Sequence, residues 1–182
     1  VSIKDASFLK SKSVQELLAL LNAYGEEARV AGGAVRNVLL GQPVKDVDIA
    51  TTAMPSEVIR RSEDAGYRTV PTGIDHGTVT VIIGGEPFEV TTLRADSDHD
   101  GRRANVDFGR DWTVDAKRRD FTINVLYADA DGTIVDLVGG LNDIESRTVR
   151  FIGDAEARIR EDYLRVLRFF RFFAWYGHGR PD

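Results

Sequence analysis

Apolar and polar residues follow one another along this chain in short blocks, some with helical spacing and some alternating as in strands. Leucines three and four residues apart follow a Ser13-x-x-Glu16 capping box, which predicts a helix over residues 13–24 that Gly25 ends. Similar patterns predict further helices over 34–40, 55–66 and 113–126, a short one after residue 140, and one from 154 onward.

Runs rich in β-branched residues predict the strands. They cover 29–31, 44–50, 67–70, 78–83, 87–93, 133–136 and 148–152. Gly84 and Gly85 predict a tight hairpin between two of them, and the polar stretch 95–112 predicts a long functional loop. This uneven mixture favours an α+β fold with a mixed, mostly antiparallel sheet over a doubly wound parallel one.

Composition narrows the classes of protein that fit. The 182 residues are enough for a domain with its own core, and without cysteine they form neither disulfides nor thiolate metal sites, as suits a reducing cytoplasm. No apolar stretch is long enough for a bilayer, and residues 1–12 lack the order of a secretory signal, so we expect a cytoplasmic protein with no membrane partner. The net charge of -5 argues against coating nucleic acid by bulk electrostatics.

The alternating segment 44–50 places two carboxylates, Asp46 and Asp48, on one face of its strand. The two negative charges of such a pair repel each other unless cations lie between the side chains. Carboxylate oxygens are hard ligands, which suit magnesium or manganese. Glu89 is the candidate third carboxylate, and such a set holds two ions about 3.5–4 Å apart. The alternative is a solvated strand face, the usual fate of an isolated Asp-x-Asp.

A glycine turn at Gly32 and Gly33 precedes the helix predicted over 34–40. Glycines let backbone N–H groups approach a phosphate, and Arg36 in the first helical turn adds a bidentate contact. A lone Gly-Gly is usually only a turn. The acidic pair that begins ten residues after Arg36 favours phosphate binding here.

The C-terminal helical stretch carries a polar stripe. Its members fall within about one third of a helix circumference and are Glu161, Asp162, Arg165 and Arg168. A solvated face with helix-spaced ion pairs is the common reading of such spacing. A carboxylate beside a guanidinium also matches the edges of cytosine and adenine, and Asp162 with Arg165 would reject uracil and guanine. The remaining, apolar face predicts a packed helix.

These blocks, in this order, resemble the catalytic head of class II tRNA nucleotidyltransferases, the family of bacterial CCA-adding enzymes and poly(A) polymerases. The matching blocks are 32–36, 46–52, 89–94, 118–124 and 161–168. The resemblance covers nearly all of residues 30–176 and implies a polymerase-β-like nucleotidyltransferase fold. It implies a head domain over 1–150 and the truncated start of a helical neck over 151–182.

The same resemblance implies a role for each block. Asp46 and Asp48 would bind Mg²⁺, Gly33 and Arg36 the triphosphate, and Arg119 and Asp120 would lie by the ribose. Base contacts are implied for Asp162, Arg165, Arg168 and Arg171. Arg102 and Arg103 resemble the family's flexible element, which is tied to the switch from C to A. An alternative for Arg119 and Asp120 is an internal ion pair. For Asn124, a structural role and a functional role both stay open.

The implied function is addition of CMP and AMP from CTP and ATP to the 3′ end of tRNA, as a CCA-adding or CC-adding enzyme. Poly(A) polymerase activity is the near alternative. A non-catalytic nucleotide-binding fragment is the alternative of another class. The aromatic run 169–176 would be an apolar surface unless further C-terminal domains or a partner chain covered it.

Overall fold

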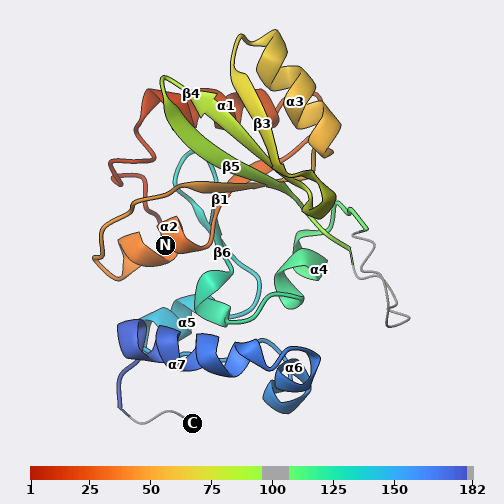
Figure 1. Cartoon of the computed structure of the whole chain (residues 1–182). Helices are drawn as coiled ribbons and strands as arrows, with labels where there is room; N and C mark the ends of the chain where they lie inside the picture. The colour runs from red at the N-terminus through yellow and green to blue at the C-terminus, as the bar shows by residue number, and fades with distance from the viewer. Residues whose placement is uncertain (96–106, 180–182) are drawn as a thin grey trace.

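A seven-stranded mixed sheet forms the centre of the computed structural model, which describes residues 1–95 and 107–179 (Figure 1). Its strands are β1 (Ala28–Ala31), β2 (Asp48–Thr51), β3 (Arg68–Gly73), β4 (Thr78–Ile83), β5 (Glu86–Thr92), β6 (Leu126–Ala128) and β7 (Ile134–Asp136). They lie in the order β3-β4-β5-β2-β1-β6-β7, in which β2 and β5 are parallel and the other neighbours antiparallel. The predicted mixed, mostly antiparallel sheet and the 84–85 hairpin are confirmed.

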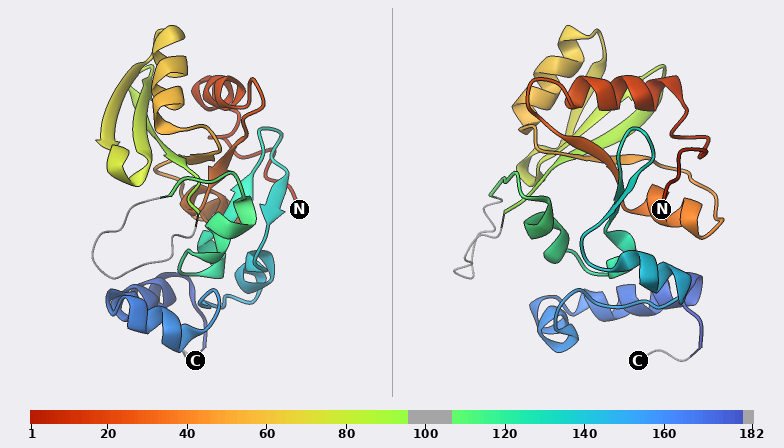
Figure 2. Two further views of the ribbon diagram at one scale, coloured as in Figure 1. Left: turned by 90° about the vertical axis from the view of Figure 1, so that its right-hand side faces the viewer. Right: turned by 180° about the vertical axis from the view of Figure 1, so that it is seen from behind.

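Helices cover both faces of this sheet. They are α1 (Lys12–Leu21), α2 (Gly33–Leu39), α3 (Pro55–Asp64), α4 (Trp112–Lys117), α5 (Gly140–Glu145), α6 (Ala155–Glu161) and α7 (Leu164–Tyr176). The two further views show α6 and α7 side by side below the sheet, at the end far from α1 and α3 (Figure 2). Among the described residues no helix combines the length and the apolar character that crossing a bilayer requires.

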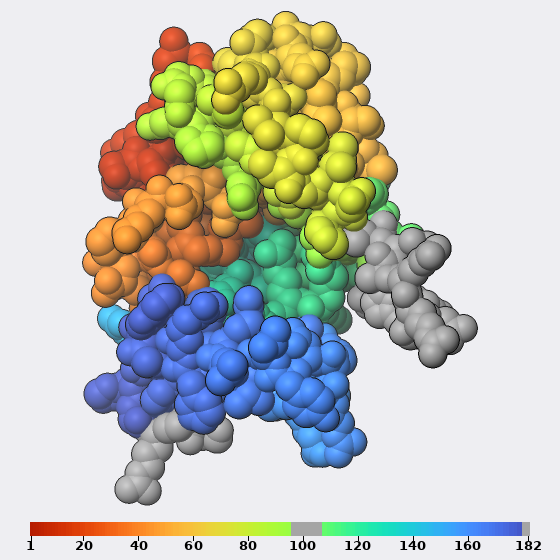
Figure 3. All heavy atoms as spheres, viewed as in Figure 1, coloured from red at the N-terminus to blue at the C-terminus, as the bar shows by residue number. Residues whose placement is uncertain are grey.

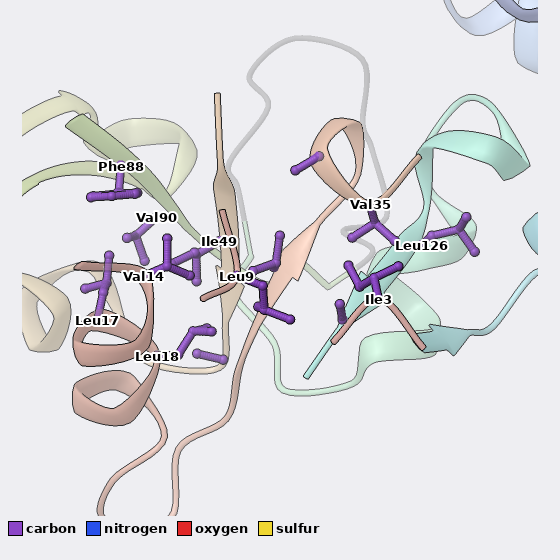
Figure 4. Close-up of a cluster of buried hydrophobic side chains, with 14 of the residues drawn as sticks. Ile3, Leu9, Val14, Leu17, Leu18, Val35, Ile49, Phe88, Val90 and Leu126 are labelled. Carbon is purple, nitrogen blue, oxygen red and sulfur yellow. The ribbon is translucent and has the colours of Figure 1, made fainter. Parts of the chain in front are cut away.

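The larger core lies between α1 and the sheet. Val14, Leu17 and Leu18 form the apolar stripe of α1 and point toward Ile49 of β2 and Val90 of β5 (Figure 4). All five side chains are fully buried, and burial of each contributes about 1.5–3 kcal/mol. This packing fixes the two parallel strands at the middle of the sheet.

A second core covers the opposite face, because alternate strand residues point the other way. Ala31 and Ala50 pack there with Trp112 and Ala116 of α4. Trp112 meets Tyr127 of β6 edge to face, with ring centroids 5.0 Å apart. Helix α4 is therefore fixed beneath the central strands.

The strand predicted over 44–50 is wrong in its first half, since β2 begins at Asp48. Asp48 pairs with Ala31, the last residue of β1, and the chain then turns at Gly32. Residues before Asp48 consequently have no β1 partner to pair with. Asp46 precedes the strand and does not share a strand face with Asp48.

The helix predicted over 113–126 is also wrong, because α4 ends at Lys117. A turn, a 3-10 helix (Thr122–Asn124) and strand β6 follow. The Ile152 N–H donates to the carbonyl of Asp120, and the Thr122 N–H donates to that of Arg150, at 2.9 and 3.1 Å. These bonds hold the chain after α4 in an extended conformation beside residues 150–152. The strand predicted over 148–152 is present only as one bridge between Phe121 and Phe151.

Helix α1 begins and ends earlier than predicted. Ser11 caps it by accepting a hydrogen bond from the N–H of Val14, so Ser13 lies inside the helix. The Asn22 side chain ends it, donating to the carbonyl of Leu18 and accepting from the N–H of Ala28. A side-chain cap therefore replaces the predicted stop at residue 25.

The single helix predicted from residue 154 onward is broken at Asp162. Its backbone is extended (φ −154°, ψ 105°), and its carboxylate accepts a hydrogen bond from the N–H of Leu164. The break separates α6 from α7, so the stripe of Glu161, Asp162, Arg165 and Arg168 spans two helices.

Helix α7 is packed on one side only. Phe169 and Phe172 are buried against Phe121, with centroids 6.1 and 5.3 Å away. The apolar side chains that the pattern assigned to a packed face are instead largely exposed: Tyr163, Leu164, Leu167 and Phe170, with Trp175 beyond them. An apolar surface on α7 follows, to which only Phe170 and Trp175 of the predicted aromatic run contribute large exposed side chains.

Candidate functional site

A cavity of about 490 Å³ lies between the sheet and the two C-terminal helices. The space-filling view shows the molecule hollowed between β3–β5 above and α6–α7 below, with residues of the 112–126 region at the floor (Figure 3). Most residues predicted for the site line this cavity, namely Gly33, Arg36, Asp48, Glu89, Arg119, Asp120, Asp162, Arg165 and Arg168. Five blocks distant in sequence therefore converge.

Two of the described site residues, Asp46 and Arg171, do not line it. Asp46 lies in the segment before β2 and is exposed. Arg171 is exposed on α7, where its guanidinium lies 5.7 Å from the ring of Phe172 and 5.8 Å from that of Trp175. Arg102 and Arg103 lie outside the described residues.

Carboxylates gather where the parallel strands meet. Asp48 of β2 stands directly opposite Glu89 of β5. Asp48 is open to the cavity, but the surrounding walls displace water from its carboxylate and thereby raise its pKa. The negative charges of Glu89 and Asp46 raise this pKa further, and the positive charge of Arg119 lowers it in part. Glu89 and Asp46 are thus each close enough to Asp48 to repel its carboxylate.

This donor set fits a divalent cation in kind. Carboxylate oxygens are the ligands that Mg²⁺ prefers, and a cation would relieve the repulsion that Asp48 experiences. Within residues 1–95 and 107–179, no three acidic, histidine or cysteine side chains converge closely enough to enclose a metal. Asp46 and Asp48 are the residues that would hold one, with Glu89 beside them.

The glycine turn forms the wall beside the carboxylates. Gly32 has φ +61°, a left-handed conformation that favours glycine, and a Cβ there would lie 3.2 Å from the carbonyl oxygen of Asn124. Its N–H donates to the carbonyl of Leu126 at 2.9 Å. The turn therefore brings backbone close to β6, and Gly33 reaches the cavity without a side chain.

Arg36 is buried and already occupied by protein partners. Its guanidinium donates to the side-chain oxygens of Asn37 and Asn124 and to the Tyr176 hydroxyl, 3.0 Å away. It also lies 4.3 Å from the centroid of the Tyr176 ring. Arg36 thus joins α2 to α7, and Asn124 has a structural partner.

The turn after α4 presents two arginines and an aspartate to the cavity. Arg119 pairs with the buried Asp115, and its Nη2 lies 2.9 Å from that carboxylate. Asp120 pairs with Arg168 of α7. Arg119 and Asp120 thus each form an internal ion pair, as the alternative reading expected, but with Asp115 and Arg168 and not with each other.

The predicted base-reading pair stands at the corner between α6 and α7. Arg165 donates to the carbonyl of Arg158 at 2.7 Å and to the Glu161 carboxylate. Asp162 uses one oxygen for the N–H of Leu164. Both side chains line the cavity, so an acceptor and a set of donors face it together.

Sequence reasoning gave no role to several cavity residues, namely Thr78, Thr91, Arg94 and Arg118. Thr91 is two residues from Glu89 on β5, so the alternation that singled out Glu89 also predicts it. Thr78 is its partner on β4, with hydroxyls 3.0 Å apart. Arg94 lies just beyond β5, and its guanidinium donates to the carbonyl of His76, a contact that no local pattern predicts.

Comparison with known proteins points to one family. Residues 28–150 match the family model of the poly A polymerase head domain. The CCA tRNA nucleotidyltransferase 1, mitochondrial, of Danio rerio is 51% identical over 148 residues, which are 81% of this chain and 34% of that protein. The chain thus spans about a third of the length of this relative.

Solved structures agree with this comparison. The Bacillus stearothermophilus CCA-adding enzyme in complex with CTP has a TM-score of 0.77 and 42% identity, over 87% of this chain and 38% of that one. A tRNA nucleotidyltransferase complexed with a primer tRNA and an incoming ATP analog has a TM-score of 0.70 and 27% identity, over 90% and 46%. Both support the polymerase-β-like arrangement of the sheet and its helices.

Proposed function

Because the chain belongs to the poly A polymerase head domain family, we propose that it is the catalytic part of a tRNA nucleotidyltransferase that adds CMP and AMP from CTP and ATP to the 3′ end of tRNA. The observation that carries this proposal is the convergence of the glycine turn, the Asp48–Glu89 pair and the arginines of 118–119 on one cavity. The CTP and tRNA complexes of similar proteins support the same choice of ligands.

The reaction is attack of the tRNA 3′ hydroxyl on the α-phosphate of the bound nucleotide, with release of pyrophosphate. Magnesium held by Asp46 and Asp48, as two ions, would lower the pKa of the attacking hydroxyl and offset charge on the leaving pyrophosphate. Gly33 admits the triphosphate to the backbone of the turn, and Arg119 and Asp120 lie by the ribose. No covalent enzyme intermediate is needed.

Base selection belongs to the corner between α6 and α7. Asp162 offers an acceptor and Arg165 offers donors on the same wall of the cavity, which complements the amine and ring nitrogen of cytosine or adenine. Arg168 and Arg171 are further nucleotide contacts under this proposal. Arg168 must first leave Asp120, with which it pairs here.

Residues 1–150 are the head under this proposal, and 151–182 are the start of a helical neck. Because the chain spans about a third of its relative's length, we expect it to bind nucleotide but to extend tRNA poorly by itself. Further domains or a partner chain would cover the exposed apolar side chains of α7. Robust CCA addition by residues 1–182 alone would contradict this expectation.

The decisive experiment gives the chain each labelled nucleotide with tRNAs lacking their last one, two or three nucleotides. We expect slow, magnesium-dependent incorporation of CMP and AMP that Asp46→Ala abolishes. Incorporation of many AMP residues would indicate a poly(A) polymerase, and CMP alone a CC-adding enzyme. Nucleotide binding without any incorporation, equal in the variant, would indicate a binding module.

A further inference from the structure

Asp115 is the most buried carboxylate of the described chain and has no place in the proposed chemistry. It lies on α4 and is 1% exposed, and it does not line the cavity. A buried charge is tolerated only where hydrogen bonds and opposite charges surround it. The partners of Asp115 therefore indicate what it does.

Each oxygen of this carboxylate has its own partners. Oδ1 accepts from the backbone N–H of Arg94 at 3.0 Å and from Nη2 of Arg118 at 2.8 Å. Oδ2 accepts from Nε of Arg119 at 3.0 Å and from the Tyr127 hydroxyl at 3.2 Å. One side chain thus binds three of the arginine residues that line the cavity.

The sequence explains this geometry. Arg118 and Arg119 follow Asp115 at the i+3 and i+4 positions, which bring side chains to one face at the end of α4. Burial disfavours the charged form of Asp115 and would raise its pKa, but the charges of Arg119 and Arg118 outweigh this effect. The pKa of Asp115 therefore lies below the ordinary value, and the carboxylate stays ionised at neutral pH.

We propose that Asp115 is a positioning residue for nucleotide binding: it holds the guanidinium groups of Arg118 and Arg119 at the cavity wall, aimed at the nucleotide. This inference rests on the proposed function for its ligand, but the orientation of the arginines is independent of it. Without Asp115, two like charges side by side would repel and turn toward solvent.

The test compares Asp115→Asn with Glu57→Gln in residues 1–182. Glu57 is a matched control, because on α3 it pairs with arginines at the same i+3 and i+4 spacing, Arg60 and Arg61, and none of the three lines the cavity. The first readout is the Kd for CTP and for ATP with Mg²⁺. The second is the NMR signal and solvent exchange of each arginine Nε–H, without nucleotide.

We expect Asp115→Asn to raise the Kd by about tenfold or more, as loss of a carboxylate behind a ligand group does in metal sites. Its Arg118 and Arg119 Nε–H signals should exchange rapidly, whereas Glu57→Gln leaves both the signals and the Kd unchanged. An Asp115→Asn protein with wild-type Kd, or with both signals still protected, would overturn the inference.

A second variant guards against loss of the fold. Tyr127→Phe removes only the hydroxyl that shares Oδ2 with Arg119, so the Arg119 signal should change while that of Arg118, on Oδ1, does not. Two unchanged signals would sink the inference. A wild-type chain with both signals protected but no binding of CTP or ATP would refute the proposed function and leave the positioning of the arginines intact.

Discussion

Arg36 illustrates how one buried side chain can join distant elements. Its guanidinium donates to Asn37, to Asn124 and to Tyr176 of α7, so three directions of its planar fork are used. An ammonium group has no such fork. We expect Arg36→Lys to lower the free energy of unfolding by about 2 kcal/mol, measured by urea denaturation without nucleotide.

Tyr176→Phe is the control for that experiment, since it removes one hydrogen bond and keeps the ring over the guanidinium. We expect Tyr176→Phe to lower the free energy of unfolding by about 1 kcal/mol. If Arg36→Lys unfolds like the wild type and only nucleotide affinity falls, Arg36 is a ligand contact and does not hold α7.

Asp115 also gives the stability of the protein a pH dependence. Its folded pKa lies below the ordinary value through Arg119 and Arg118, although burial opposes this. A lowered carboxyl pKa stabilises the fold above the unfolded value, near pH 3.9, and that stability is lost as the pH falls through the folded pKa. We therefore expect Asp115→Asn to be about 2 kcal/mol less stable at pH 7, and the gap to narrow below about pH 4.

Urea denaturation at a series of pH values measures this gap. Tyr127→Phe removes one hydrogen bond to this carboxylate, so its gap should be smaller than that of Asp115→Asn and should narrow over the same pH range. A constant difference between Asp115→Asn and the wild type from pH 7 to pH 3 would contradict the linkage.

At the scale of elements, α6 is tied to the turn that carries the cavity arginines. Nη2 of Arg158 donates to the backbone carbonyls of Arg118 and Arg119, and the Arg158 side chain is 13% exposed. We expect Arg158→Ala to lower the free energy of unfolding by about 2 kcal/mol and to expose α6 to proteolysis.

Arg160→Ala is the matched control on the same helix, because its ion pair with Glu156 is exposed on both sides. Such pairs contribute about 0–1 kcal/mol, so this variant should resist urea and protease like the wild type. Equal losses in the two variants would argue that α6 is not held through the Arg118–Arg119 carbonyls.

The elements also show which predictions a local pattern supports. Strands β4 and β5 and helix α3 follow from alternation, a glycine pair and a proline start, because those signals are contained in the segment itself. The start of β2 depends on where β1 ends, and the end of α4 depends on bonds to residues 150–152. Those partners are distant in sequence, so no local pattern could predict them.

The candidate site likewise contains residues that a local pattern predicts and residues that no local pattern predicts. Residues in recognisable blocks, such as Asp48, Glu89 and Arg165, line the cavity as expected, although their roles remain predictions. Asp46 precedes β2 and does not line the cavity, contrary to the alternation. Asp115 carries no motif of its own, and its importance follows only from the burial and partners that the fold gives it.

At the scale of the whole molecule, helix α7 has one buried side and one exposed side. Phe169 is 9% exposed, while its neighbour Phe170 is 55% and Leu167 is 68% exposed. Exposed apolar side chains gathered on one helix face favour association with another surface. We expect residues 1–182 to associate with themselves as concentration rises, through this face of α7.

Sedimentation velocity over a hundredfold range of concentration measures this association. Leu167→Glu with Phe170→Glu should abolish it and leave the free energy of unfolding within about 0.5 kcal/mol, because both side chains are already in water. Phe169→Ala should do the reverse, since it removes a buried ring and costs about 3–5 kcal/mol while the exposed face persists. A wild-type chain that stays monomeric at every concentration would mean that this face is too weakly apolar to need a cover, and the proposed partner surface on α7 would have to be abandoned.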